Sequence, residues 1–174
     1  MPFFPSLPDN AGIGSIWKLN DNLRRPMNDL AKVIMRDESP LTAGQRETIA
    51  AFVSGLNKCD YCFKGHIEMA VNLGAIREQV MEALDDIDSS SFEENFKPIL
   101  HFVKKLTLTP ASISQSDANS VYAAGWTERA LHDAILVCCR FNFMNRLSLG
   151  HGLDPDGVDP TVRAATMSYS NPST

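Results

Sequence analysis

Two cysteines and a histidine stand close together in the stretch CDYCFKGH, which runs from Cys59 to His66. A C-x-x-C pair can supply half of a four-ligand zinc site, and His66 could add a third ligand. No fourth cysteine or histidine is close in sequence, and the adjacent Cys138 and Cys139 cannot form a second C-x-x-C pair. The pattern therefore favours thiol chemistry over a metal site.

A redox role follows from the expected position of the two cysteines at the start of a helix. Unpaired amides and the helix dipole favour a thiolate there. Cysteines three residues apart, such as Cys59 and Cys62, can come close enough to form a disulfide. His66 follows Cys62 by four residues, on the same helical face, where a neutral imidazole can accept the thiol proton. A histidine without a catalytic role, in the core or on the surface, is the alternative.

Glu47 lies twelve residues before Cys59, on the preceding expected helix. If a short turn at Asn57 and Lys58 folds the two helices against each other, the Glu47 carboxylate could orient His66 or relay a proton. An exposed glutamate is the alternative, and the spacing alone leaves both interpretations open.

The composition predicts a soluble protein with one globular domain. The chain has 174 residues, of which 44% are hydrophobic and 21% charged. A formal net charge of -5 disfavours binding to nucleic acid or to an anionic membrane. The longest apolar run, AILVCC, is far shorter than the roughly 20 residues that cross a bilayer, and the first residues do not resemble a signal peptide. We therefore expect a cytoplasmic location, where a close cysteine pair is more often catalytic or metal-binding than structural.

Helical spacing and capping signals predict helices throughout the middle of the chain. Thr42 and Gln45 form a T-x-x-Q capping box, Gly74 is placed to end a helix, and Thr127 is placed to begin one. No run of alternating apolar residues predicts a strand. We expect helices over residues 26–36, 42–56, 59–73, 77–84, 96–109, 114–124 and 127–150.

These elements predict an all-α protein with a single domain of about six to eight helices. Residues 1–20 are expected to form an irregular N-terminal arm, residues 21–162 the helical domain, and residues 163–174 a polar C-terminal tail. The last predicted helix is apolar on nearly all sides from Leu131 to Met144, so we expect it to be central or buried between subunits.

Three polar residues interrupt that apolar helix: Asn142, Asn145 and Arg146. Buried polar groups need hydrogen-bond partners, so we expect these side chains to bind neighbouring helices or a second subunit rather than to act in catalysis.

The pattern E-x11-C-x-Y-C-x3-H, from Glu47 to His66, resembles the core motif of the AhpD-like alkylhydroperoxidases of the carboxymuconolactone decarboxylase superfamily. The resemblance covers about residues 25–155, and FNFMNRLSLGHGLD at 141–154 is similar to the branch called peroxidase-related enzymes. It implies an AhpD-like helical bundle that forms a homo-oligomer. It also implies reduction of hydroperoxides by a cysteine pair, with no metal and no organic cofactor.

Residue by residue, the resemblance implies that Cys62 is the peroxidatic cysteine, Cys59 the resolving cysteine, and His66 with Glu47 the proton relay. Tyr61 stands where the best-known alkylhydroperoxidase has a further histidine, so proton delivery is expected to differ. The implied electron donor is a dithiol, either a lipoyl protein or a thioredoxin-like protein. Relatives that decarboxylate a muconolactone share the fold but do not use the thiol pair.

Three functions remain open on the sequence alone. The first is a thiol peroxidase that acts on hydroperoxides, and the second is a disulfide reductase or redox sensor that uses the same cysteines. The third is a non-catalytic helical oligomer that retains the motif.

Overall fold

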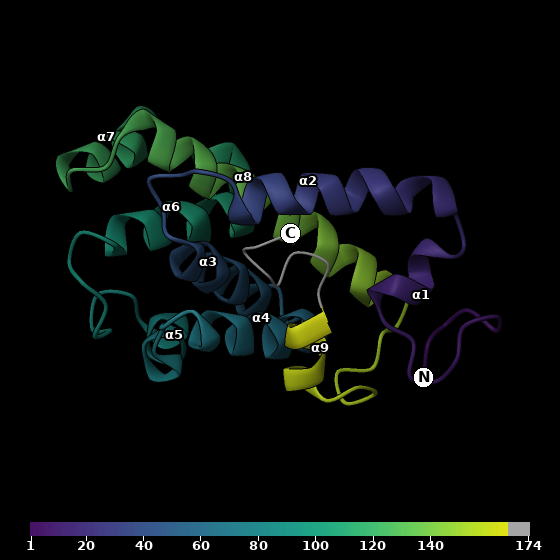
Figure 1. The fold of residues 1–174 in the computed structure, drawn as a ribbon. Helices are drawn as coiled ribbons and strands as arrows, with labels where there is room; N and C mark the ends of the chain where they lie inside the picture. The colour runs from purple at the N-terminus through teal and green to yellow at the C-terminus, as the bar shows by residue number, and fades with distance from the viewer. Residues whose placement is uncertain (167–174) are drawn as a thin grey trace.

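Helices make up the regular structure of residues 1–166, the part of the chain that the computed structural model describes (Figure 1). This part holds nine α-helices and two short 3-10 helices and no strand, which confirms the all-α prediction. The elements are α1 (Ile13–Trp17), η1 (Asp21–Leu23), α2 (Arg24–Arg36), α3 (Ala43–Leu56), α4 (Asp60–Asn72), α5 (Arg77–Asp85), α6 (Lys97–Leu108), η2 (Pro110–Ser112), α7 (Gln115–Ala123), α8 (Glu128–Gly150) and α9 (Pro160–Thr166).

Two helices were not expected, so the predicted number of six to eight is too low for the described residues. Helix α1 lies in the segment expected to be an irregular arm, and α9 runs from the end of the expected domain into the expected tail. Both helices are short and pack against the rest of the domain. Ile16 and Trp17 of α1 are buried against Met144 and Leu153, and Ala164 of α9 is buried in the main hydrophobic core. Five to seven residues carry too little periodicity to predict such helices. The rest of the predicted tail, residues 167–174, lies outside the described residues.

The predicted capping signals act as expected. Gln45 N donates to Thr42 Oγ1 over 3.1 Å and Thr42 N donates to Gln45 Oε1 over 2.9 Å, which completes the capping box of α3. Thr127 accepts a hydrogen bond from Ala130 N at the start of α8. Gly74 follows α4 with a φ of 92°, a conformation that glycine adopts without strain.

Helix α3 lies at the centre of the fold and packs against α2, α4, α5, α6 and α8 (Figure 1). Nine of its 14 residues are buried, including Ile49, Phe52 and Val53. Helix α8 covers this core from one side rather than occupying its centre, and its Leu136, Phe143 and Leu149 remain exposed on the single chain. The expected homo-oligomer, in which such residues would be covered, stays a prediction.

The turn at Asn57 and Lys58 brings α3 and α4 together, as expected. Lys58 has a φ of 54°, and Cys59 N donates to Ser54 O over 2.9 Å, which closes the turn. The two helices make the most extensive contact in the fold. This hairpin sets Cys59 at the N-cap of α4 and turns the start of α4 toward the middle of α3.

Candidate active site

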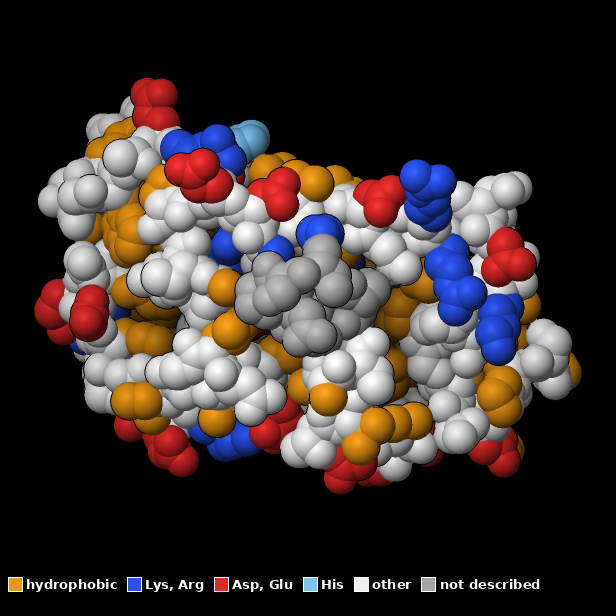
Figure 2. Space-filling view, in the orientation of Figure 1, with side chains coloured by type: hydrophobic (Ala, Val, Ile, Leu, Met, Phe, Trp, Pro, Cys, Tyr) orange, Lys and Arg blue, Asp and Glu red, His pale blue; other side chains and the backbone are white. Residues whose placement is uncertain are grey.

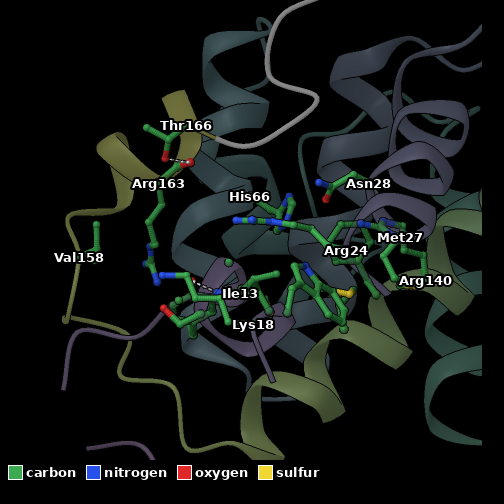
Figure 3. Close-up of a pocket in the computed structure, with 18 residues that line it drawn as sticks. Ile13, Lys18, Arg24, Met27, Asn28, His66, Arg140, Val158, Arg163 and Thr166 are labelled. Carbon is green, nitrogen blue, oxygen red and sulfur yellow. Dashed lines mark hydrogen bonds between the residues drawn. The ribbon is translucent and has the colours of Figure 1, made fainter. Parts of the chain in front are cut away.

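A cavity of about 520 Å³ lies beside the start of α4, and both Cys62 and His66 line it. Its other walls come from α1, α2, α8 and α9, so segments far apart in the chain meet there (Figure 3). Cys62 and His66 are each 5% exposed, so both are nearly removed from solvent. A volume of this size suits a small organic ligand.

His66 is held by a carboxylate on the neighbouring helix. Its Nδ1 lies 2.7 Å from Glu47 Oε2, and Glu47 Oε1 accepts a hydrogen bond from Arg36 Nη2 over 2.8 Å. Glu47 is fully buried, so the alternative of an exposed glutamate is wrong. When Nδ1–H donates to a carboxylate, the neutral imidazole keeps its lone pair on Nε2. The arrangement therefore leaves Nε2 of His66 able to accept a proton.

The environment of Cys62 favours the thiolate. Hydrogen bonds from the Cys59 thiol and from Ser148 Oγ, 3.3 Å away, lower the pKa of Cys62 to about 6 against the opposing effect of burial. The charge of His66 and a hydrogen bond from Asn145 act in the same direction. The surroundings of Cys62 therefore favour its ionised form.

Cys59 is the protonated member of the pair. Its hydrogen bond to Cys62 raises the pKa of Cys59 first, and burial raises it further. The side chain is fully buried and does not line the cavity, and both sulfurs are in the reduced state. The two cysteines therefore differ: Cys62 lines the cavity in surroundings that favour the thiolate, whereas Cys59 does not line the cavity and its surroundings favour the thiol.

The polar residues of α8 mainly connect helices, as predicted for Asn145. Its Nδ2 donates to Ser54 Oγ over 3.0 Å, and its Oδ1 accepts from Asn57 Nδ2 over 2.9 Å. Asn142 also accepts from Asn57 and donates to Thr107 on α6. Arg146 donates to the side chain and carbonyl of Asn142 on its own helix.

Two site residues were not predicted from the sequence: Arg36, which donates a hydrogen bond to Glu47, and Ser148, which is hydrogen-bonded to Cys62. Arg36 ends α2, and no local spacing connects it with α3. Ser148 lies within the FNFMNRLSLGHGLD stretch, and the similarity of that stretch to peroxidase-related enzymes was the one signal that could have pointed to Ser148.

Tyr61 connects the cavity walls. Its hydroxyl accepts a hydrogen bond from Ile13 N over 3.3 Å, and the Arg163 guanidinium lies 4.3 Å from its ring centre. A Cβ at Gly12 would lie 2.8 Å from the hydroxyl oxygen, so glycine permits this close approach. Burial raises the pKa of Tyr61. Tyr61 thus joins α4 to α1 and α9.

The other two cysteines lie apart from this cavity. Cys138 is buried next to Thr107, and burial raises the pKa of Cys138 to about 11, whereas Cys139 is exposed. Within residues 1–166, no group of three or more His, Cys, Asp or Glu side chains could hold a metal ion. In the same range, no helix has both the length and the apolar character needed to cross a membrane.

Part of the chain is similar to known proteins. Residues 22–105 match the carboxymuconolactone decarboxylase family. An uncharacterized protein of the cox locus of Paracoccus denitrificans is 29% identical over 75 residues, which are 43% of this chain and 67% of that protein.

Three solved structures share the fold. A peroxidase-related protein from Silicibacter sp. TM1040 has a TM-score of 0.74 at 24% identity, over 80% of this chain and 73% of that one. An uncharacterized peroxidase-related protein with an alkylhydroperoxidase AhpD core, from Ralstonia eutropha JMP134, has a TM-score of 0.74 at 18% identity, over 89% and 79% of the two chains. A variant of the debrominase Bmp8, in complex with 2,3,4-tribromopyrrole, has a TM-score of 0.70 at 18% identity, over 86% and 79%.

Just under half of the chain therefore matches the carboxymuconolactone decarboxylase family, and this match together with the shared fold supports an AhpD-like member of that superfamily. Within that superfamily, it has the AhpD-like helical fold.

Proposed function

We propose that this protein is a cysteine-based peroxidase, which reduces organic hydroperoxides with the Cys59–Cys62 pair and a proton relay of His66 and Glu47. One observation carries the proposal: Cys62, whose pKa is lowered to about 6, lines the same cavity as His66, whose Nδ1 is held by Glu47. A nucleophile and an oriented base thus share one cavity that can admit a small organic molecule.

The first step uses the Cys62 thiolate, and His66 receives the thiol proton. The sulfur attacks the terminal oxygen of the hydroperoxide and the O–O bond breaks, so sulfur is oxidised and the peroxide is reduced. His66 returns a proton to the departing alkoxide, which leaves as an alcohol. Cys62 remains as a sulfenic acid.

The second step uses Cys59. Its sulfur attacks the sulfenic acid, an S–S bond forms, and water leaves with the Cys59 proton. The hydrogen bond between the two cysteine side chains supports this assignment, because it requires the sulfurs to lie close together. The burial of Cys59 supports its role as the resolving cysteine, since a peroxide in the cavity meets Cys62.

A dithiol donor completes the cycle by two exchange reactions, which reduce the disulfide and oxidise the donor. The donor must attack Cys62 from the cavity, since Cys59 is fully buried. Such limited access favours a slender dithiol, as on a lipoyl arm, over the broad surface of a thioredoxin-like protein. A cytoplasmic location, where dithiol donors are kept reduced, remains our prediction.

Stopped-flow mixing of the fully reduced protein with tert-butyl hydroperoxide tests the proposal. We expect consumption of one peroxide per chain, release of one tert-butanol, and a mass loss of two hydrogens confined to the peptide that contains Cys59 and Cys62. A protein that exchanges disulfides with a dithiol but does not react with peroxide would instead be a disulfide reductase or a redox sensor. If neither reaction occurs, the chain is a helical protein that retains the motif without its chemistry.

A further inference from the structure

The cavity beside Cys62 is basic, although the whole chain has a net charge of -5. Within the described residues, its lining includes four cationic side chains and no aspartate or glutamate. These cations come from separate elements: Lys18 follows α1, Arg24 begins α2, Arg140 belongs to α8 and Arg163 to α9 (Figure 3). A concentration of one sign of charge in a concave site attracts ligands of the opposite sign.

Arg163 is the most buried of these four cationic side chains. It is 7% exposed, and its Nη2 donates to Pro155 O over 3.1 Å. The guanidinium also lies over the ring of Tyr61. Its Nε and Nη1 are buried and have no hydrogen-bond acceptor among residues 1–166. Buried donors without an acceptor are unfavourable, and a carboxylate can accept from two guanidinium nitrogens at once.

The nearby carboxylate of Asp159 does not take this place. Arg163 lowers the pKa of Asp159 only as the weakest of several effects, the largest being the hydrogen bond from the Thr161 hydroxyl. Asp159 is exposed and does not line the cavity. Within residues 1–166, the Nε and Nη1 groups of Arg163 therefore remain able to bind an anion.

The remaining walls are mostly apolar. Side chains of Ile13, Trp17, Met27, Phe141 and Met144 line the cavity together with Cys62. A small inorganic anion would leave these apolar walls without contacts, whereas an organic acid would cover them. A cavity that combines basic groups with apolar walls is expected to bind an anion with an apolar part more tightly than a purely polar anion.

We propose that this cavity binds an organic carboxylate, whose acid group pairs with Arg163 and whose apolar part lies along the walls that lead to Cys62. Combined with the peroxidase activity proposed above, on which this part rests, the preferred substrate is a hydroperoxide that carries a carboxylate. Lys18 and Arg24 are exposed and help to attract the anion, and Figure 2 shows basic side chains gathered over α1 and the start of α2, at the right of the view.

Binding can be tested without turnover, by calorimetry of the reduced protein with octanoate, 1-octanol and inorganic phosphate. We expect octanoate to bind more tightly than both other probes and to bind less tightly as the salt concentration rises. Octanol binding as tightly as octanoate would overturn the proposal, because no acid group would then be recognised. Phosphate binding as tightly as octanoate would overturn it as well, because the site would be a simple anion site.

Substitution at the basic residues locates the binding. Arg163→Gln should weaken octanoate binding by about 10- to 100-fold, the effect of removing a charged hydrogen-bond partner. Lys18→Gln with Arg24→Gln, at exposed positions that are safe for folding, should weaken it by a smaller factor, while Arg25→Gln beside them should leave it unchanged. Unchanged octanoate binding in a folded Arg163 variant would contradict the assignment of the acid group to Arg163. If Arg163→Gln does not fold, the exposed double variant alone decides.

The two proposals fail separately. If octanoate binds through the basic residues but no hydroperoxide is reduced, the carboxylate site stands and the peroxidase proposal falls. If hydroperoxides are reduced with the same kcat/KM whether or not they carry a carboxylate, and octanoate does not bind, the peroxidase proposal stands and the carboxylate site falls.

Discussion

Glu47 and His66 form a buried hydrogen bond of 2.7 Å between Oε2 and Nδ1, which joins the central helix α3 to the helix that carries Cys62. Arg36 of α2 binds the other oxygen of the same carboxylate over 2.8 Å. The hydrogen-bonded side chains of Arg36, Glu47 and His66 therefore come from α2, α3 and α4, and His66 lines the cavity. Phe141 packs against the His66 ring in a T-shaped arrangement, with centroids 4.4 Å apart, and further restricts the orientation of the His66 ring.

The proposed base predicts large kinetic effects at His66. His66→Ala should slow the first reaction with hydroperoxide by roughly 100- to 10,000-fold at pH 7, the usual contribution of a well-placed general base. Glu47→Gln should slow it less, because His66 is retained and only its orientation and charge are altered. Single-turnover stopped-flow measurement of both variants provides the check. His101→Ala, at an exposed histidine on α6, is the matched control. Equal rates in the His66 and His101 variants would show that His66 is not the base.

Arg36 is predicted to stabilise the fold through Glu47. Arg36→Met removes one partner of a buried carboxylate, so the free energy of unfolding should fall by about 3 to 5 kcal/mol. Urea denaturation measures this change. Adding Glu47→Gln to Arg36→Met should restore part of the loss, because the buried charge is then gone. A loss equal to that of Arg25→Met, an exposed arginine of the same helix, would contradict the pairing as a source of stability.

The reaction with hydroperoxide should depend on pH in a defined direction. The pKa of Cys62 is lowered to about 6, and only the thiolate reacts, so the rate constant should rise with pH through about 6 and level off above about 7. Ser148→Ala removes a hydrogen bond to the thiolate, so its midpoint should move upward by about 1 to 2 pH units. Rate profiles from pH 4.5 to 9 decide this point. A wild-type rate that still rises between pH 7 and 9 would mean an unperturbed thiol.

The exposed apolar residues of α8 predict a homo-oligomer. Leu136, Phe143 and Leu149 are 36%, 50% and 47% exposed on the single chain, and α8 is apolar along much of its length. Light scattering should therefore give a mass above that of one chain at micromolar concentration, and Phe143→Arg should lower it. Tyr122→Arg, at an exposed aromatic residue on α7, is the control and should leave the mass unchanged. A wild-type monomer would contradict the prediction.

The parts of the fold that were predictable have local causes. The capping box of Thr42 and Gln45, the glycine after α4 and the periodic apolar positions each involve residues within one or two turns, so the sequence displays them directly. The spacing of Cys62 and His66 on one helix is local in the same way, and both residues line the same cavity. Helices α1 and α9 are stabilised by contacts with distant residues and were missed for that reason.

The rest of the site depends on how helices pack. Whether Glu47 faces α4 or solvent depends on the angle between α3 and α4, and the spacing of apolar residues in the sequence does not determine that angle. Arg36 and Ser148 reach the site from α2 and α8, which are distant in sequence from the motif. The basic character of the cavity was even harder to predict from the sequence, because its four cationic residues lie on four different segments and come together only in the folded chain.

The most direct test of the proposed chemistry compares the two single cysteine variants in their first reaction with hydroperoxide. Cys62→Ser should lose the fast reaction, because Cys59, the remaining thiol of the pair, is buried away from the cavity and burial raises its pKa. Cys59→Ser should react once and stop as a sulfenic acid that dimedone traps on Cys62. Loss of the first reaction in Cys59→Ser with its retention in Cys62→Ser would reverse the assignment. Wild-type rates in both variants would place the chemistry outside this pair and contradict the account.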